Sequence, residues 1–194
     1  MSPPDSSDER IVRLRQSVLN APVVWKDDYA YFVHPLTDGV PRQSAVMLQE
    51  ARDIVLEMVD WEQVDLILGI EAMGIPLAST LSIATGKPLV IARKRPYGLP
   101  GEVVVDQSTG YSKGSIYLND VNPGDRIFII DDVVSTGGTL RAVLSAVEDA
   151  GAILEDVIIV FEKGNKVDEL VAQTGWPLRS LVKLRMDGDK VVLL

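Results

Sequence analysis

The sequence predicts an α/β protein with a central parallel sheet flanked by helices. Two observations lead to this fold class. Runs such as residues 64–70 and 126–130 are apolar with little alternation, as expected of strands that are covered on both faces. Segments with helical patterns, such as residues 75–86 and 138–152, separate these runs. Regular alternation of buried strands and helices indicates parallel strands joined by crossover helices.

The remaining elements follow from periodicity and from turn residues. Ile11, Leu14 and Val18 recur at helical spacing before Pro22, which predicts a first helix over residues 8–20. Two β-type runs flank Lys26-Asp27-Asp28, which predicts a hairpin over residues 23–33. Further helices are expected at residues 44–60 and 167–175, further strands at 88–93 and 156–161, short strand candidates at 102–105 and 115–118, and a closing strand pair at 178–186 and 190–194.

Length and composition predict one domain over residues 1–194. A chain of 194 residues that is 46% hydrophobic can form one good core. The polar, acidic residues 1–8 are expected to be a disordered tail. Residues 94–115 have no strong core pattern, and loops of this length are commonly functional or disordered.

Charge and residue counts exclude several classes of protein. The net charge of -9 argues against a nucleic-acid-binding protein. The chain has no cysteine and only one histidine, His34, so thiolate and multi-histidine metal sites are excluded. No apolar run reaches the roughly 18 residues that a membrane span requires, and no signal peptide is present. A soluble, cytoplasmic protein without membrane partners is therefore expected.

The segment RIFIIDDVVSTGGTL, residues 126–140, predicts an anion site. In open α/β folds ligands bind beyond the carboxyl ends of the strands, which here are the loops after Ile70, Ile91 and Ile130. After Ile130 come two aspartates and then a glycine-containing loop that begins a helix. Such a loop turns backbone N–H groups toward an anion, and the helix N-terminus adds its positive end. Neither a P-loop nor a GxGxxG sequence is present.

Asp131 and Asp132 would repel a phosphate, so they are expected to bind something beside it. Paired carboxylates suit the vicinal hydroxyls of a sugar, because each carboxylate accepts hydrogen bonds from two donors. Together the two halves of the segment indicate a site for a ribose 5-phosphate. Two alternatives stay open for the separate halves: the aspartates could hold Mg²⁺ alone, and residues 135–138 could be an ordinary helix N-cap.

The same stretch resembles the 5-phosphoribosyl-1-pyrophosphate (PRPP) motif of type I phosphoribosyltransferases. Segments similar to purine members follow in the expected order: FVHPLTDG, GIEAMG, ARKR, LPGE, TGYSKG and VFEKG. The similarity covers about residues 10–185 and is closest to the archaeal hypoxanthine/guanine group, whose sequences are adenine-phosphoribosyltransferase-like. The resemblance implies the type I phosphoribosyltransferase fold with a small N-terminal hood over residues 23–43 and a flexible, mobile flap over residues 94–115.

The resemblance also implies roles for particular residues. Asp131, Asp132 and Lys94 are implied to be catalytic, with the two aspartates on the ribose hydroxyls. The remaining binding residues are implied as follows: Ser135, Thr136, Gly137, Gly138 and Thr139 for the 5-phosphate; Glu71, Ala72, Met73, Gly74, Arg93, Lys94, Tyr111 and Lys113 for pyrophosphate; Tyr31, Phe32 and Lys163 for the base. The family often has a non-proline cis peptide in the loop at residues 71–74. Many adenine enzymes have arginine where Met73 stands.

By the same resemblance the reaction is a purine salvage transfer from PRPP to hypoxanthine or guanine, with Mg²⁺ held by the substrate phosphates and no protein ligand set. Adenine or xanthine remains the alternative base. Lys163 would favour a 6-oxopurine by donating to its oxygen, while His34 would either touch the substrate or cap the hood loop. The family usually forms homodimers or larger homo-oligomers.

The proton acceptor is not identified by the sequence. Related enzymes have a carboxylate where Ser135 stands or in the flap near Gly110, and this chain has neither. Glu102 or Asp106 could assist, or the purine could enter ionised or lose its proton to water. Two other functions are weighed: a PRPP-sensing regulator, which the absence of a basic module disfavours, and a plain sugar-phosphate or Mg²⁺-binding module, which the flap disfavours.

Overall fold

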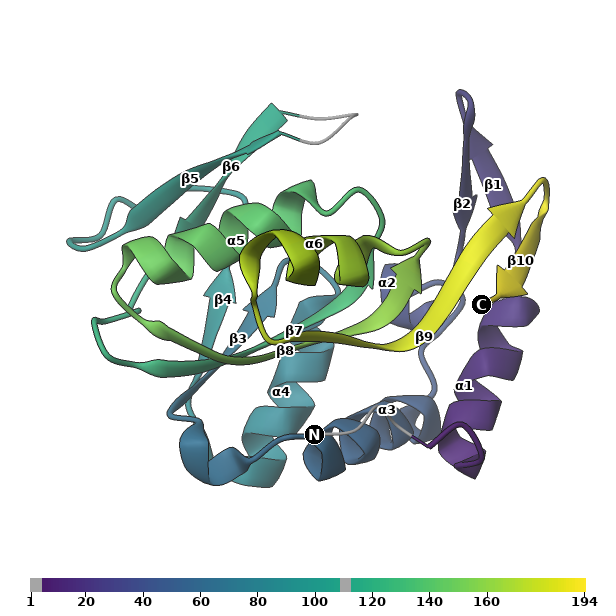
Figure 1. Cartoon of the computed structure of the whole chain (residues 1–194), viewed down its shortest axis with the longest axis horizontal. Helices are drawn as coiled ribbons and strands as arrows, with labels where there is room; N and C mark the ends of the chain where they lie inside the picture. Colours follow the sequence, from purple (N-terminus) through teal and green to yellow (C-terminus); the bar gives the residue numbers. More distant parts are fainter. Residues whose placement is uncertain (1–4, 109–112) are drawn as a thin grey trace.

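The centre of the protein is a six-stranded sheet in the order β10-β9-β8-β7-β3-β4 (Figure 1). This computed structural model describes residues 5–108 and 113–194. The strands of the sheet are β3 (Leu66–Ile70), β4 (Leu89–Ala92), β7 (Arg126–Val134), β8 (Ile153–Lys163), β9 (Leu178–Asp187) and β10 (Lys190–Leu193). Neighbouring strands pair in parallel except β9 and β10, which are antiparallel. The predicted parallel sheet is therefore confirmed, and it carries one antiparallel strand at its edge.

Helices cover both faces of this sheet, as the apolar strand sequences predict. On one side lie α1 (Glu9–Leu19), α3 (Ala45–Met58) and α4 (Gly74–Thr85); on the other lie α5 (Gly138–Asp149) and α6 (Lys166–Thr174) (Figure 1). Successive residues of one strand enter different cores: Phe128 packs in the core with α1, α3 and α4, whereas Ile127 and Ile129 pack in the core with α5 and α6. Strands that are buried on both faces need apolar residues at nearly every position.

Two hairpins extend from the sheet layers. One contains β1 (Val23–Lys26) and β2 (Tyr29–Phe32), as predicted for the hood, and is followed by a single-turn helix α2 (Pro35–Asp38) that the sequence analysis missed. The other contains β5 (Val103–Ser108) and β6 (Lys113–Leu118), which are longer than the predicted short strands of the flap. Figure 1 shows them at opposite sides of α5 and α6.

The base of the flap hairpin is anchored to the sheet. Ile116 and Leu118 are buried in the core with α5. A bridge between Arg93 and Tyr117 joins β6 to the chain just after β4. The described part of the flap therefore has regular structure where the sequence pattern predicts only two short strand candidates.

Several element boundaries differ from the sequence prediction; β8, for example, spans residues 153–163 where 156–161 is predicted. β7 does not end at Ile130; it continues to Val134, because its pairing with β8 extends to Glu162. At the N-terminus, the Asp8 side chain accepts a hydrogen bond from the backbone N–H of Arg10 and caps α1. Residues 1–4 lie outside the described residues. A short 3-10 helix, Trp61–Gln63, was also not predicted.

The strand order places a topological switch point between β3 and β7. After β3 the chain moves outward to β4, and after β7 it moves in the opposite direction to β8 and β9. The connections that follow β3 and β7 therefore lead to opposite sides and leave a crevice at the carboxyl ends of the two strands. Ligands of open α/β sheets bind in such a crevice. The GIEAMG and DDVVSTGG segments both begin there.

Close packing of α4 on β3 requires glycine at position 69. A Cβ atom on Gly69 would lie 2.7 Å from the Cβ atom of Ala78 and 3.0 Å from the carbonyl oxygen of Gly74. We expect Gly69→Ala to lower the free energy of unfolding by about 1–3 kcal/mol, because the helix must move away from the strand. The matched control is Gly114→Ala, where a Cβ atom meets nothing within 4 Å; its effect should stay within about 0.5 kcal/mol. Equal effects of the two substitutions in urea denaturation would contradict this account.

Candidate active site

A cavity of about 350 Å³ lies at the switch point between β3 and β7. Its walls come from the loop after β3, the end of β7, the loop that begins α5, and α2. The residues that line it are Thr37, Ile70, Glu71, Ala72, Met73, Lys94, Asp131, Asp132, Val133, Val134, Ser135, Thr136, Gly137, Thr139 and Leu140. Most of the residues that the sequence predicts to bind PRPP therefore meet in one cavity.

The two aspartates of β7 form the buried, polar part of this cavity. Asp131 and Asp132 are each 8% exposed. Burial raises the pKa of both carboxyl groups, and for Asp132 the charge of Asp131 raises the pKa further. The positive charge of Lys94 acts in the opposite direction on the pKa of Asp131. Ionisation of the buried pair is therefore unfavourable in the ligand-free protein. A ligand that donates hydrogen bonds to the two carboxylates would stabilise their charged form.

Gly74, the first residue of α4, packs directly against this pair. A Cβ atom on Gly74 would lie 3.0 Å from Oδ1 of Asp131 and 2.9 Å from the carbonyl oxygen of Ile130. Gly74 does not line the cavity itself, so its contribution in this structure is to let α4 approach β7.

The loop of residues 135–139 has the geometry of an anion cradle. Gly137 has a φ of +79°, which places it in the left-handed region as the N-cap of α5, and as a glycine it has no side chain of its own to cap the helix. The amino end of α5 therefore faces the cavity, where Ser135, Thr136 and Thr139 also lie. Free backbone N–H groups and the helix dipole at such an end favour a phosphate. Gly138 begins the helix behind the cavity wall.

The loop after β3 forms the opposite wall. The peptide bond between Glu71 and Ala72 is cis, as the family resemblance implies. One carboxylate oxygen of Glu71 accepts a hydrogen bond of 3.0 Å from the backbone N–H of Lys94 and lies 3.2 Å from Nε of Arg93. Glu71 therefore holds the loop after β4 beside the cavity. Lys94 lines the cavity, whereas the Arg93 guanidinium lies 5.9 Å from the ring centre of Tyr97.

Two predicted pyrophosphate residues lie in the flap. Tyr111 is outside the described residues. Lys113 begins β6, where its backbone pairs with Ser108. Their proposed contacts with the ligand therefore stay predictions.

A second cavity, of about 200 Å³, adjoins the first beneath the hood. Its lining residues are Tyr29, Tyr31, Phe32, Thr37, Asp38, Val133, Ser135 and Lys163. Thr37, Val133 and Ser135 line both cavities, so a flat group here would lie next to a group held by the aspartates. After the ligands that the sequence predicts for them, we call this the base cavity and the larger one the sugar-phosphate cavity.

Lys163 links the hood to β8 inside the base cavity. Its Nζ donates a hydrogen bond of 2.8 Å to the carbonyl oxygen of Ala30 and lies 3.6 Å from the ring centre of Tyr29. Burial lowers the pKa of Lys163 to about 8. The Tyr29 hydroxyl is hydrogen-bonded to the Ser135 hydroxyl. The hood is thereby connected both to β8 and to the anion cradle.

The predicted aromatic residues differ in their surroundings. Phe32 is buried and packs edge-to-face on Phe161, with ring centres 5.8 Å apart, so it belongs mainly to the core. Tyr31 is 38% exposed, and its ring centre lies 4.4 Å from that of Tyr29. Of the two, Tyr31 has the more accessible ring face.

His34 is a capping residue of the hood. It is 1% exposed, and its Nδ1 accepts a hydrogen bond from the backbone N–H of Leu36. Its Nε2 lies 3.0 Å from the Ser17 hydroxyl, and burial lowers its pKa to about 4. The structure therefore favours capping over contact with a substrate.

Sequence reasoning missed Tyr29, Thr37 and Asp38 as cavity residues. All three belong to the hood, where the sequence shows only that a hairpin and a loop are present. The hood folds back over the end of β7, and this contact joins residues about one hundred positions apart, such as Tyr29 and Ser135. In the sequence, the only indication of these cavity residues was a tyrosine, Tyr29, next to the hairpin turn.

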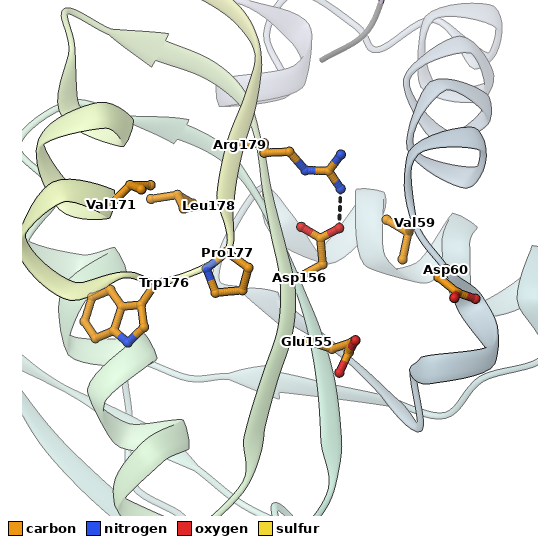
Figure 2. A pocket seen from close by; sticks show the side chains of 9 residues that line it. All are labelled: Val59, Asp60, Glu155, Asp156, Val171, Trp176, Pro177, Leu178 and Arg179. Atoms are coloured by element: carbon orange, nitrogen blue, oxygen red, sulfur yellow. Dashed lines mark hydrogen bonds and ion pairs between the residues drawn. The ribbon is translucent and has the colours of Figure 1, made fainter. Parts of the chain in front are cut away.

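A third cavity, of about 390 Å³, lies at the other end of the strands (Figure 2). It is lined by Val59, Asp60, Glu155, Asp156, Val171, Trp176, Pro177, Leu178 and Arg179. Arg179 forms an ion pair with Asp156, as Figure 2 shows, and also donates to the carbonyl oxygen of Met58. This cavity is at the amino ends of β8 and β9, away from the switch point. The short 3-10 helix at its edge is already capped by the carboxylate of Asp60, which accepts from the backbone N–H of Glu62.

The fold is shared with solved phosphoribosyltransferase structures. Adenine phosphoribosyltransferase from Thermoanaerobacter pseudethanolicus superimposes with a TM-score of 0.74 at 24% identity, covering 89% of this chain and 99% of that one. The enzyme from Leishmania donovani gives a TM-score of 0.76 at 21% identity, covering 94% and 85% of the two chains. At these identities the similarity establishes the fold alone.

The fold and the two joined cavities define a class of protein, and sequence comparison agrees with it. The family model for the phosphoribosyl transferase domain matches residues 44–172. This chain belongs to the phosphoribosyltransferase family. It is 49% identical to the hypoxanthine/guanine phosphoribosyltransferase of Ferroglobus placidus over 93% of this chain and 96% of that one. It is 46% identical to the enzyme of the same name from Methanothermococcus okinawensis, over 93% and 98% of the two chains.

Burial of the aspartate pair has a measurable effect on stability. The pKa of the Asp132 carboxyl group is higher in the folded protein than its ordinary value of 3.8. The protonated carboxyl group therefore favours the folded state. This contribution to the free energy of unfolding is lost as the pH rises from 3.8 through the raised pKa of the folded protein. We expect Asp132→Asn to raise the free energy of unfolding near neutral pH, by about 0.5–2 kcal/mol, because the amide never ionises.

The increase in the free energy of unfolding caused by Asp132→Asn should become smaller as the pH falls toward 4. Thermal unfolding of the ligand-free protein measures this difference. The control is Asp149→Asn on the exposed end of α5, which should change stability by less than about 0.5 kcal/mol at either pH. A destabilised Asp132→Asn variant at neutral pH would contradict the raised pKa.

Proposed function

We propose that this protein transfers the 5-phosphoribosyl group of PRPP to hypoxanthine and guanine, forming IMP or GMP and pyrophosphate. The observation that carries the proposal is the convergence of the buried aspartate pair and the anion cradle in one cavity that adjoins a base cavity containing Lys163. Relatives that share almost half of its residues over nearly the whole chain bear that enzyme name. The reaction belongs to purine salvage.

In this proposal the sugar-phosphate cavity binds the donor. Asp131 and Asp132 accept hydrogen bonds from the two ribose hydroxyls, and the amino end of α5 with residues 135–139 binds the 5-phosphate. Charge-assisted hydrogen bonds compensate the burial of the pair. This division explains why two carboxylates stand beside a phosphate site: they bind the neighbouring part of the same molecule.

Pyrophosphate would lie between the loop after β3 and Lys94. Glu71, Ala72 and Met73 line that wall, and Met73 brings no charge. The cationic contribution therefore depends on Lys94 and Arg93, and on Lys113 with Tyr111 if the flap closes. Closure of the flap would exclude water from the activated sugar.

The residues in this cavity suit a magnesium ion that arrives with the substrate. Within the described ranges, no group of three or more His, Cys, Asp or Glu side chains is arranged to hold a metal ion. The phosphates of PRPP would supply the oxygen ligands that Mg²⁺ prefers, while Asp131 and Asp132 remain assigned to the ribose hydroxyls. When bound, Mg²⁺ neutralises charge on the departing pyrophosphate.

The base cavity favours a 6-oxopurine in this proposal. The Lys163 ammonium can donate to the oxygen at position 6, whereas adenine has an amino group there, which is itself a donor. Tyr31 offers an aromatic face for stacking. Adenine and xanthine remain the alternative bases, and binding of PRPP without transfer would indicate a regulatory protein or a simple binding module.

Catalysis would depend on position and charge. A purine ring nitrogen attacks the anomeric carbon of PRPP, pyrophosphate leaves with the bonding electron pair, and the configuration at that carbon inverts. The aspartate pair holds the ribose, and Lys94 stabilises the negative charge that develops on pyrophosphate.

The proposal is tested by incubating the protein with PRPP, Mg²⁺ and each purine base while pyrophosphate release is followed. We expect turnover with hypoxanthine and guanine and much less with adenine. Product nucleotides should be identified by chromatography. Absence of any nucleotide product with every base tested would overturn the proposed activity.

The aspartate pair should dominate the affinity for PRPP. We expect Asp131→Asn combined with Asp132→Asn to weaken PRPP binding by a few kcal/mol, because the charged acceptors for the ribose hydroxyls are lost. Isothermal titration with PRPP and Mg²⁺ measures this directly. Thermal unfolding of the same variant shows whether it is folded, and unchanged PRPP affinity in a folded variant would exclude the assigned role.

Lys163 should control the choice of base. We expect Lys163→Met to lower kcat/KM for hypoxanthine by about 10- to 100-fold, the loss of one hydrogen bond to a charged group. Because burial lowers the pKa of Lys163 to about 8, the ammonium loses its proton as the pH rises through that value. KM for hypoxanthine should therefore increase above pH 8 in the unmodified protein.

The increase in KM for hypoxanthine above pH 8 should be absent in Lys163→Met. The control variant Lys190→Met changes an exposed lysine in β10 and should behave as the unmodified protein does. If both lysine variants showed equal kinetics, Lys163 would have no role in recognising the base.

Finer properties are part of the proposal as well. We expect one phosphoribosyltransferase domain, a cytoplasmic location and a homodimer or larger homo-oligomer, which analytical ultracentrifugation would test. No helix in the described ranges has the length and apolar composition of a membrane-spanning segment.

A further inference from the structure

The proposed reaction requires a group that accepts a proton. When a neutral purine forms a bond from its ring nitrogen to the ribose, the N–H proton must leave. We propose that the Asp38 carboxylate accepts this proton through its Oδ1 atom. The inference rests on the proposed transfer to a purine, and it adds a catalytic residue that the sequence did not indicate.

The position of Asp38 suits this role. It is the last residue of α2 and lines the base cavity together with Lys163 and Ser135. Its neighbour Thr37 lines both cavities, so this part of the hood stands where the base and the ribose would join. Asp38 also affects the aspartate pair: the pKa of Asp132 is raised first by burial, then by Asp131, and also by the charge of Asp38.

The carboxylate is held by one oxygen and has the other available. Oδ2 accepts a hydrogen bond of 3.0 Å from the backbone N–H of His34 and one of 2.5 Å from the Thr37 hydroxyl. No described residue donates a hydrogen bond to Oδ1. Two bonds to the same oxygen fix the orientation of the group, as a proton acceptor requires. His34 in turn is fixed by its contacts with Leu36 and Ser17.

The carboxylates suggested by the sequence are less suitable. Glu102 accepts hydrogen bonds from the backbone N–H groups of Tyr97 and Gly98 and from the Asn119 side chain, so it holds the start of the flap together. Asp106 accepts a bond from the Ser115 hydroxyl within the flap hairpin. Neither lines the base cavity, whereas Asp38 is the carboxylate among the lining residues there.

Lys163 would assist the transfer from another wall of the same cavity. An ammonium group that donates to the purine oxygen withdraws electron density and makes the ring N–H more acidic. The complete step then balances. The nitrogen lone pair forms the bond to the anomeric carbon, and the bond from that carbon to the pyrophosphate oxygen breaks, leaving its electrons on pyrophosphate. The N–H proton passes to Asp38, which later releases it to water.

The test compares purines of different acidity in Asp38→Asn. The amide keeps an oxygen that can accept from His34 and Thr37 but is a much weaker base. With guanine we expect kcat to fall about 100-fold or more, as for loss of general base catalysis, while KM for PRPP stays within about twofold. With 8-azaguanine, which ionises more readily, the loss should be at least tenfold smaller because little or no proton transfer is needed.

Two further variants separate catalysis from structure. Asp38→Glu retains a carboxylate and should recover part of kcat, and Asp28→Asn, an exposed aspartate in the turn of the hood hairpin, should be as active as the unmodified protein. Thermal unfolding shows whether each variant is folded.

The outcomes are distinct. A folded Asp38→Asn variant with undiminished activity, or with equal losses for guanine and 8-azaguanine, would overturn the inference and leave Asp38 as a cap of the hood. That result leaves the transferase proposal intact. An unmodified protein inactive with every purine would instead overturn the transferase proposal, and the role of Asp38 with it.

Discussion

The burial of two adjacent carboxylates at the end of β7 is the constraint on which the rest of the site depends. Asp131 and Asp132 lose most of their contact with water, which raises the pKa of both carboxyl groups, and the charge of Asp131 raises the pKa of Asp132 further. α4 packs on them through Gly74, and the amino end of α5 lies beside them. A ligand that offers hydroxyl donors next to a phosphate satisfies the pair and the helix end together. Stability is therefore exchanged for affinity at this point of the sheet.

The hood completes the site by an interaction between distant parts of the chain. Lys163 at the end of β8 binds the carbonyl oxygen of Ala30, and the Tyr29 hydroxyl contacts Ser135. These contacts close a base cavity against the sugar-phosphate cavity. The hood also positions Asp38, whose carboxylate accepts hydrogen bonds from the backbone N–H of His34 and from the Thr37 hydroxyl. In the proposed function, binding of the base and the orientation of the proton acceptor therefore both depend on the hood.

Much of the fold was predictable because the strands are buried on both faces and their apolar runs are distinct from the helical patterns. The extension of β7 to Val134 was not, since polar Asp131 and Asp132 look like the end of a strand when pairing with β8 is unknown. The single-turn helix α2 was missed because four residues show no periodicity. In the site, the motif residues on β7 and the following loop were predictable, whereas the hood residues were not.

The sequence by itself determined the α/β class, the anion loop and the paired acids, because these depend on local patterns: apolar runs, glycines at a turn, and adjacent carboxylates. Tertiary structure alone decided which strand ends meet, since β3 and β7 become neighbours only through the strand order of the sheet. It also decided the surroundings of each side chain. His34 became a buried cap, Phe32 a core residue and Asp38 a wall of the base cavity. Burial and hydrogen-bond partners come from segments far apart in the chain, and no local pattern encodes them.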